Sequence, residues 1–120
     1  MAKTRILPRC WRRLEKRRME SDLLALLQRL NLNPGSKIAI LGIGNELNGD
    51  DAAGVLAARA LIEQTEERES RKGSRSLRLL IYEAGPAPEN FTGPLRRFAP
   101  DVVLLIDAAE MGVPPGTVRL

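Results

Sequence analysis

Three carboxylates stand where an apolar segment ends or where a helix is expected to begin. Asp50 and Asp51 follow the apolar run 38–41 and a glycine turn, and Asp107 directly follows the run 102–106. A buried strand that ends in an unpaired acid needs a physical reason, because an isolated charge is costly to bury. Carboxylates that converge at such a place indicate a metal site or an acid–base site.

Two more polar residues belong to the same candidate site. Asn45 lies in the glycine turn, where its amide would orient a carboxylate or a substrate backbone, and Glu83 follows the apolar run 77–82. Each has a structural alternative. Asn45 is a common left-handed turn residue, Asp50 and Asp51 favour a helix start as caps, and Glu83 is an acid at a strand end.

The residues that are absent restrict this chemistry further. The chain contains no histidine and one cysteine, Cys10, so carboxylates are the main ligands available. Carboxylates alone suit a hard cation such as Mg²⁺, whereas a borderline transition metal normally requires imidazole or thiolate as well. The lone cysteine also precludes an internal disulfide, which fits a reducing, cytoplasmic compartment.

The elements that must position these acids alternate between strand and helix. We expect strands at about 37–43, 77–82 and 102–106, helices at about 51–67 and 88–98, and the start of a fourth strand at 117–120. Strands that are apolar throughout predict a parallel sheet covered on both faces, hence a three-layer α/β/α fold with a mainly parallel twisted sheet.

The expected strand order brings the acids together. If the order is 2-1-3, strands one and three are neighbours, and ligands bind in open α/β sheets between their carboxyl ends. Asp50 and Asp51 follow the first strand and Asp107 ends the third. The sequence therefore predicts that these acids meet in one crevice, with Glu83 on its flank.

The first glycine turn also resembles part of a dinucleotide-binding fingerprint. That fingerprint needs a third glycine at position 47, which is Leu47, and acids at the helix start would repel a phosphate. A nucleotide-binding domain is therefore the weakest of the alternatives that we consider.

The N-terminal part of the chain differs in charge from the rest. Residues 1–20 carry eight basic and two acidic residues, whereas the remaining hundred carry eleven basic and thirteen acidic ones. We interpret residues 1–36 as a basic extension with a short leucine-rich helix that Ser21 or Asp22 caps, and 37–120 as the main domain. Without interleaved aromatic residues the extension does not predict nucleic-acid binding, and no apolar run is long enough to span a membrane.

Taken together, these motifs resemble the [NiFe]-hydrogenase maturation endopeptidases, most of all the branch that processes the large subunit of hydrogenase 3. The resemblance covers residues 37–120 and lies in three blocks: 42–54 (GIGNELNGDDAAG), 83–90 (EAGPAPEN) and 105–112 (LIDAAEMG) with Pro115-Gly116. It implies an aspartic-type endopeptidase that removes a C-terminal extension from a nickel-loaded large-subunit precursor. It also implies that the protease has no intrinsic cofactor and recognises the nickel in the precursor.

The resemblance also implies roles for individual residues. The family's metal-contacting acids correspond to Asp51 and Asp107, which are the expected catalytic and metal-contacting residues, while Asn45, Asp50 and Glu83 are expected to bind substrate. The third contact in the family is a histidine that lies further along the chain than residue 120. We therefore expect the domain to be incomplete at its C-terminal edge, and a truncated, non-catalytic homologue that binds metal or precursor is the alternative.

Overall fold

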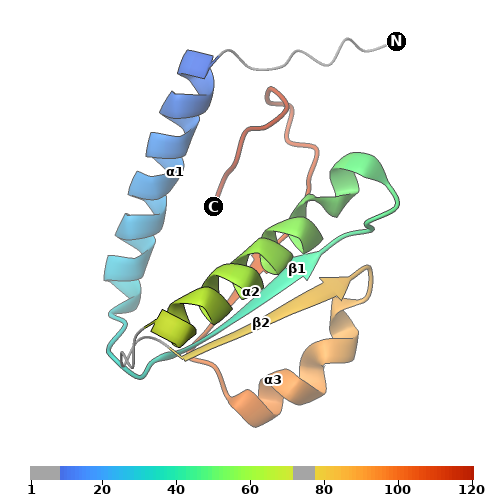
Figure 1. Ribbon diagram of the computed structural model, residues 1–120. Coiled ribbons are helices and arrows are strands. Elements are labelled where there is room, and N and C mark those ends of the chain that lie inside the picture. Colours follow the sequence, from blue (N-terminus) through green and yellow to red (C-terminus); the bar gives the residue numbers. More distant parts are fainter. Residues whose placement is uncertain (1–8, 72–77) are drawn as a thin grey trace. The chain divides into compact units, whose positions relative to one another are not determined.

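A computed structural model of the chain describes residues 9–71 and 78–120, and Figure 1 shows the arrangement of its elements. Strands alternate with helices along the chain, as the hydrophobic pattern predicts. The elements in order are α1 (Arg9–Leu30), β1 (Lys37–Ile43), the 3-10 helix η1 (Gly49–Ala52), α2 (Ala53–Arg71), β2 (Arg78–Gly85), the 3-10 helix η2 (Pro88–Phe91), α3 (Thr92–Phe98) and β3 (Val102–Ile106).

The three strands form one parallel sheet in the order β2-β1-β3. Leu41 of β1 pairs with Tyr82 on one side and with Leu105 on the other, so all three carboxyl ends lie at the same edge. Both the α/β class and the strand order expected from the sequence are confirmed. The first and third strands also have the predicted bounds.

The core lies where β1 meets α2. Ile38, Ala39, Ile40 and Leu41 are all buried, as expected for a central strand covered on both faces. A Cβ atom at Gly42 would overlap the Gly54 carbonyl, so helix and strand approach closely at this position. This close approach, rather than large side chains, brings the start of α2 against the sheet.

The opposite face of the sheet is covered by η2 and α3. Because side chains alternate along a strand, Tyr82 points away from α2, and its ring lies 4.9 Å from the ring of Phe91. Lys37 points the same way and donates to the Phe98 carbonyl at 3.2 Å. The fold therefore has three layers, helix, sheet and helix, over β1 and β2.

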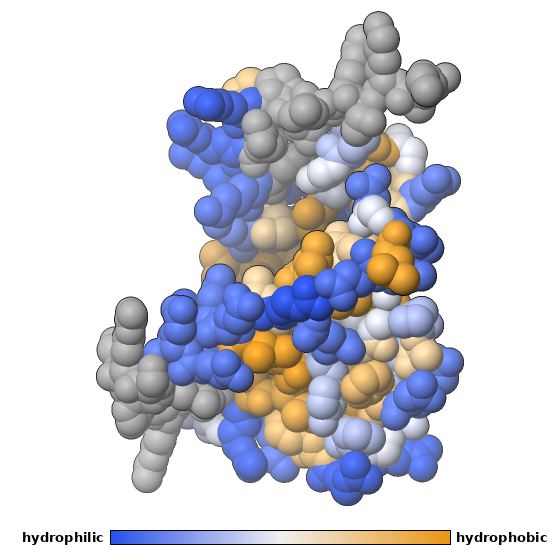
Figure 2. Space-filling model, turned by 45° about the vertical axis from the view of Figure 1, so that its right-hand side comes forward, coloured by the Kyte–Doolittle hydropathy of each residue, from blue (hydrophilic) through white to orange (hydrophobic). Residues whose placement is uncertain are grey.

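The edge strand β3 is less well covered on that second face. Val103 and Leu105 are 45% and 58% exposed, whereas their neighbour Leu41 is 3% exposed. Figure 2 shows another side of the molecule, where hydrophobic residues lie among hydrophilic ones. Coverage on both faces was thus correctly predicted for β1 but not for β3.

Three sequence predictions need correction. The N-terminal helix is not short: it begins at Arg9, so Ser21 and Asp22 lie inside it rather than at its start. Residues 117–120 form no strand. The helix predicted to end at about residue 67 continues to Arg71 as α2, and residues 72–77 lie outside the described residues.

The chain divides into two compact units, one of residues 33–109 and the other of residues 1–32 with 110–120. The first contains the whole sheet with its helices, and the second contains α1. In the part of the chain that the structure describes, no helix is both long enough and apolar enough to cross a membrane. The division of the chain at residue 36 remains a prediction.

Candidate active site at the carboxyl ends of the strands

The turn after β1 is built around Gly44. Its φ of +140° lies in a region that other residues rarely adopt, and a Cβ atom there would overlap the Asp51 carbonyl. The Gly44 N–H donates to the Gly85 carbonyl at 3.0 Å, which ties the turn to β2. Only a glycine therefore lets the chain leave β1 this close to the start of the helix.

Asn45 and Asp51 are brought into direct contact. The Asn45 backbone N–H donates to the Asp51 carbonyl at 3.1 Å and to its side-chain Oδ2 at 3.2 Å. The Asn45 side-chain Oδ1 accepts from the Leu47 N–H at 3.0 Å, which closes an Asx turn. The Asn45 N–H thus fixes the Asp51 carboxylate from the turn before it. Because its partner lies in that turn, this hydrogen bond does not cap α2.

Asp50 and Asp51 share one 3-10 turn but differ in exposure. Both lie in the first turn of η1, where Asp50 is exposed and Asp51 is half-buried. Negative charge at the start of a helix is favourable because the free N–H groups there carry partial positive charge. Both acids benefit from this effect, but Asp50 faces solvent, whereas one side of Asp51 lies against the protein.

Asp107 reaches the same edge from the neighbouring strand. It follows Ile106, which pairs with Gly42, and it is exposed. The backbone of Gly54 lies against the carbonyl oxygens of both Ile43 and Ile106, since a Cβ atom there would overlap them. The start of α2 therefore sits across the ends of β1 and β3, the two strands whose following segments carry Asp51 and Asp107.

Glu83 has a partner that the sequence did not reveal. Arg59 of α2 donates from Nε to the Glu83 carboxylate at 2.8 Å. Its two terminal nitrogens bind the Glu46 carboxylate at 2.7 and 3.0 Å. Hydrogen bonds and charge attraction from Arg59 hold the pKa of Glu46 below its ordinary value, and the two carboxylates raise the pKa of Arg59.

The contacts of Arg59 with Glu46 and Glu83 were not predicted from the sequence. The signals available were an arginine in the second turn of the helix that follows the first strand, and an acid next to Asn45. Neither residue identifies its partner until the sheet is assembled. Glu83, predicted to follow a strand over 77–82, lies inside β2, which continues to Gly85, and it is bound to Arg59. Its place at the flank of the site stays a prediction.

Chemically, this edge presents several carboxylates and no complete metal centre. Among residues 9–71 and 78–120, no group of three or more histidine, cysteine or acidic side chains is arranged to hold a metal ion. Two of the carboxylates, Glu46 and Glu83, are engaged by Arg59. Asp50, Asp51 and Asp107 are the candidate acids that Arg59 does not bind, and their meeting in one crevice stays a prediction.

Comparison with known proteins assigns the chain to a family. A family model described as hydrogenase maturation protease matches residues 56–120, which include Asp107 but begin after Asp51. The chain therefore belongs to the hydrogenase maturation protease family, and the resemblance found in the sequence is confirmed.

Individual relatives agree with that assignment. Over 84 residues the chain is 37% identical to a protein of Methanocaldococcus jannaschii assigned as a hydrogenase maturation protease, covering 70% of this chain and 48% of that protein. Over 81 residues it is 33% identical to the hydrogenase 3 maturation protease of Escherichia coli K12, covering 68% and 46%.

A solved structure is also similar. The crystal structure of a [NiFe] hydrogenase maturation protease from Thermococcus kodakarensis KOD1 matches with 38% identity and a TM-score of 0.47, over 65% of this chain and 44% of that one. The chain thus spans about half the length of the relatives that it matches.

Proposed function

We propose that this protein is an endopeptidase that removes the C-terminal extension of a [NiFe]-hydrogenase large-subunit precursor after nickel insertion. The observation that carries the proposal is the Asp51 carboxylate, which Asn45 fixes where α2 crosses the ends of β1 and β3. Membership of the maturation protease family supports the same reaction. It gives no support to nucleotide binding.

In this proposal the nickel belongs to the substrate. Asp51 and Asp107 contact the precursor's nickel and place the scissile peptide beside it. Asn45, Asp50 and Glu83 border the path of the substrate chain. The partner is a protein, not a nucleic acid, and the reaction is assigned to the cytoplasm, which a single cysteine fits.

The hydrolytic step follows ordinary carboxylate chemistry. An ionised carboxylate takes a proton from water while the water oxygen attacks the scissile carbonyl carbon. The carbon–nitrogen bond then breaks, and the leaving amine receives the proton. Asp51 is the better placed of the two acids to act as this base, because its orientation is fixed by the Asn45 N–H.

A cleavage assay on nickel-loaded precursor tests the proposal. We expect cleavage by the 120-residue chain and its loss in Asp51→Asn and Asp107→Ala, with circular dichroism confirming that both variants fold. Glu63→Gln, which changes an exposed acid of α2, is the matched control and should cleave normally.

The same assay separates the alternative function. A chain that binds nickel-loaded precursor without cutting it would be a non-catalytic homologue. Cleavage that persists in Asp107→Ala would show that the site has been assigned to the wrong acids.

A further inference from the structure

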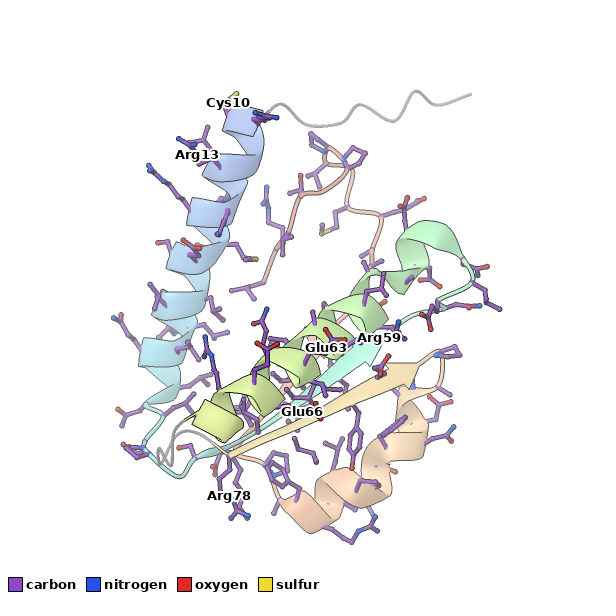
Figure 3. The ribbon with its side chains drawn as sticks, in the orientation of Figure 1. Cys10, Arg13, Arg59, Glu63, Glu66 and Arg78 are labelled. Carbon is purple, nitrogen blue, oxygen red and sulfur yellow. The ribbon has the colours of Figure 1, made fainter. Side chains whose placement is uncertain are left out.

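Arg59 binds two carboxylates at once, and the proposed reaction does not use it directly. Its guanidinium contacts Glu46 along one edge and Glu83 along the other, with nitrogen–oxygen distances from 2.6 to 3.0 Å. The three side chains come from α2, the turn after β1, and β2. Figure 3 shows Arg59 extending from α2 toward the end of β1.

The geometry of this cluster is the bidentate binding of a carboxylate by a guanidinium. Two terminal N–H groups bind the two oxygens of one carboxylate in a planar fork, which fixes orientation as well as distance. The remaining edge binds Glu83, so one cation joins two carboxylates that would otherwise repel each other. A lysine ammonium has no such fork.

The cluster contributes little to global stability. Arg59, Glu46 and Glu83 side chains are 39%, 53% and 37% exposed, and ion pairs at such exposure are weak. Its location is more informative. Glu46 directly follows Asn45, the residue whose N–H orients the Asp51 carboxylate.

We propose that Arg59 is a positioning residue: by clamping Glu46 against Glu83 it holds the turn 44–51 so that Asn45 presents Asp51 to the substrate. The clamp also binds two carboxylates of this edge, which leaves Asp50, Asp51 and Asp107 as the acids open to a metal-bearing ligand. The catalytic part of this inference rests on the proposed function. The structural part, in which Arg59 holds the turn 44–51, is independent of the proposed function.

Hydrogen exchange of backbone amides tests the structural part on the whole chain. In Arg59→Met we expect the amides of residues 45–51 to exchange up to about fivefold faster, as the loss of one partly exposed ion-pair cluster allows. Amides inside β1 and α2 serve as the internal reference and should not change. Arg68→Met, at an exposed arginine of the last turn of α2, is the matched control.

A double-mutant cycle identifies the partner. Glu46→Gln should speed exchange of the same amides, and Arg59→Met combined with Glu46→Gln should add little, because both changes release one contact. Arg59→Lys, which keeps the charge without the fork, should restore only part of the protection. Additive effects, or unchanged exchange in Arg59→Met, would overturn the clamp.

The cleavage assay then separates the two proposals. If the wild-type chain cleaves precursor, Arg59→Met should lower kcat and leave KM nearly unchanged, since Arg59 acts through Asp51 rather than on the substrate. Normal kcat in Arg59→Met would refute its positioning role. Absence of wild-type cleavage together with the expected exchange pattern would instead refute the proposed function and keep the clamp.

Discussion

At the scale of single residues, the candidate site depends on short local contacts made by backbone groups. Asp51 is held by the N–H of a residue six positions earlier, and that approach is possible because residue 44 is glycine. The turn around Gly44 therefore sets the position of the Asp51 carboxylate.

Replacing Gly44 should show this dependence. Gly44→Ala places a Cβ atom against the Asp51 carbonyl at a φ of +140°, and we expect it to lower the free energy of unfolding by about 2 kcal/mol or more. Urea denaturation measures this. Gly49→Ala is the control, because Gly49 has a φ of +52° and open space around it, and it should cost about 1 kcal/mol. Equal losses in both variants would contradict the close packing of the turn.

The ion pair between Glu46 and Arg59 should respond to acid. Arg59 lowers the pKa of Glu46 from its ordinary value of 4.5, so the pair is fully formed above that value and is lost as the pH falls through the lowered pKa. A carboxyl-detected NMR titration should give a midpoint for Glu46 below the ordinary value. In Arg59→Met the midpoint should return upward. A midpoint that is the same in both proteins would rule out the pair in solution.

At the scale of elements, the contact between α2 and the sheet is set by small residues. Gly54 lies against the carbonyl oxygens that end β1 and β3, so it decides how closely the helix start approaches the site. In most helices a glycine-to-alanine change is favourable, because alanine has the higher helix propensity. At Gly54 the change should instead be unfavourable, because the Cβ atom would overlap two carbonyl oxygens.

A pair of alanine variants tests the reversal. Gly54→Ala should destabilise by about 1–3 kcal/mol through overpacking. Gly93→Ala in α3, where a Cβ atom would meet only the end of the Arg97 side chain at 3.6 Å, should be neutral or stabilising by up to about 1 kcal/mol. Thermal melts of both variants give the comparison. Stabilisation by Gly54→Ala would show that the helix sits further from the strands.

The unequal coverage of the sheet gives a second prediction at this scale. Leu41→Ala removes a side chain that is 3% exposed and should cost about 2–5 kcal/mol. Leu105→Ala removes one that is 58% exposed from the neighbouring strand, and it should cost about 1 kcal/mol or less. Chemical denaturation distinguishes the two. A large loss in Leu105→Ala would mean that another surface covers β3 in solution.

At the scale of the whole molecule, the chain contains two compact units, and the core described here lies in only one of them. The sheet, its two helical layers and all five predicted site residues fall within residues 33–109. The other unit contains α1, whose first half is strongly basic. The candidate site residues and the basic segment therefore lie in different units of the chain.

Removal of α1 tests this separation. A chain lacking residues 1–32 should keep a cooperative melting transition, because the buried residues of the sheet unit come from β1, α2, η1 and β2. Circular dichroism at increasing temperature measures the transition. Loss of cooperative melting would show that the sheet needs α1 to fold.

Most of the sheet was predictable because its signals are local. The run 38–41 is apolar at every position, as is typical of a strand buried on both faces, and the glycines that follow it mark its end. The N-terminal helix was misjudged because Ser21 and Asp22 look like caps, whereas continued helical propensity on both sides carries the helix through them. The predicted strand at 117–120 failed because a strand needs a partner as well as apolar residues.

The sequence by itself predicted the order of the strands, which the structure confirms, and it named the acids proposed for the site. Residue type, spacing and the glycine turn are local properties, and they also carry the family resemblance. The tertiary structure decided the partners: Asn45 for Asp51, and Arg59 for Glu46 and Glu83. Such partners are separated by as many as 24 residues along the chain, so only the packing of α2 across the parallel strands selects them.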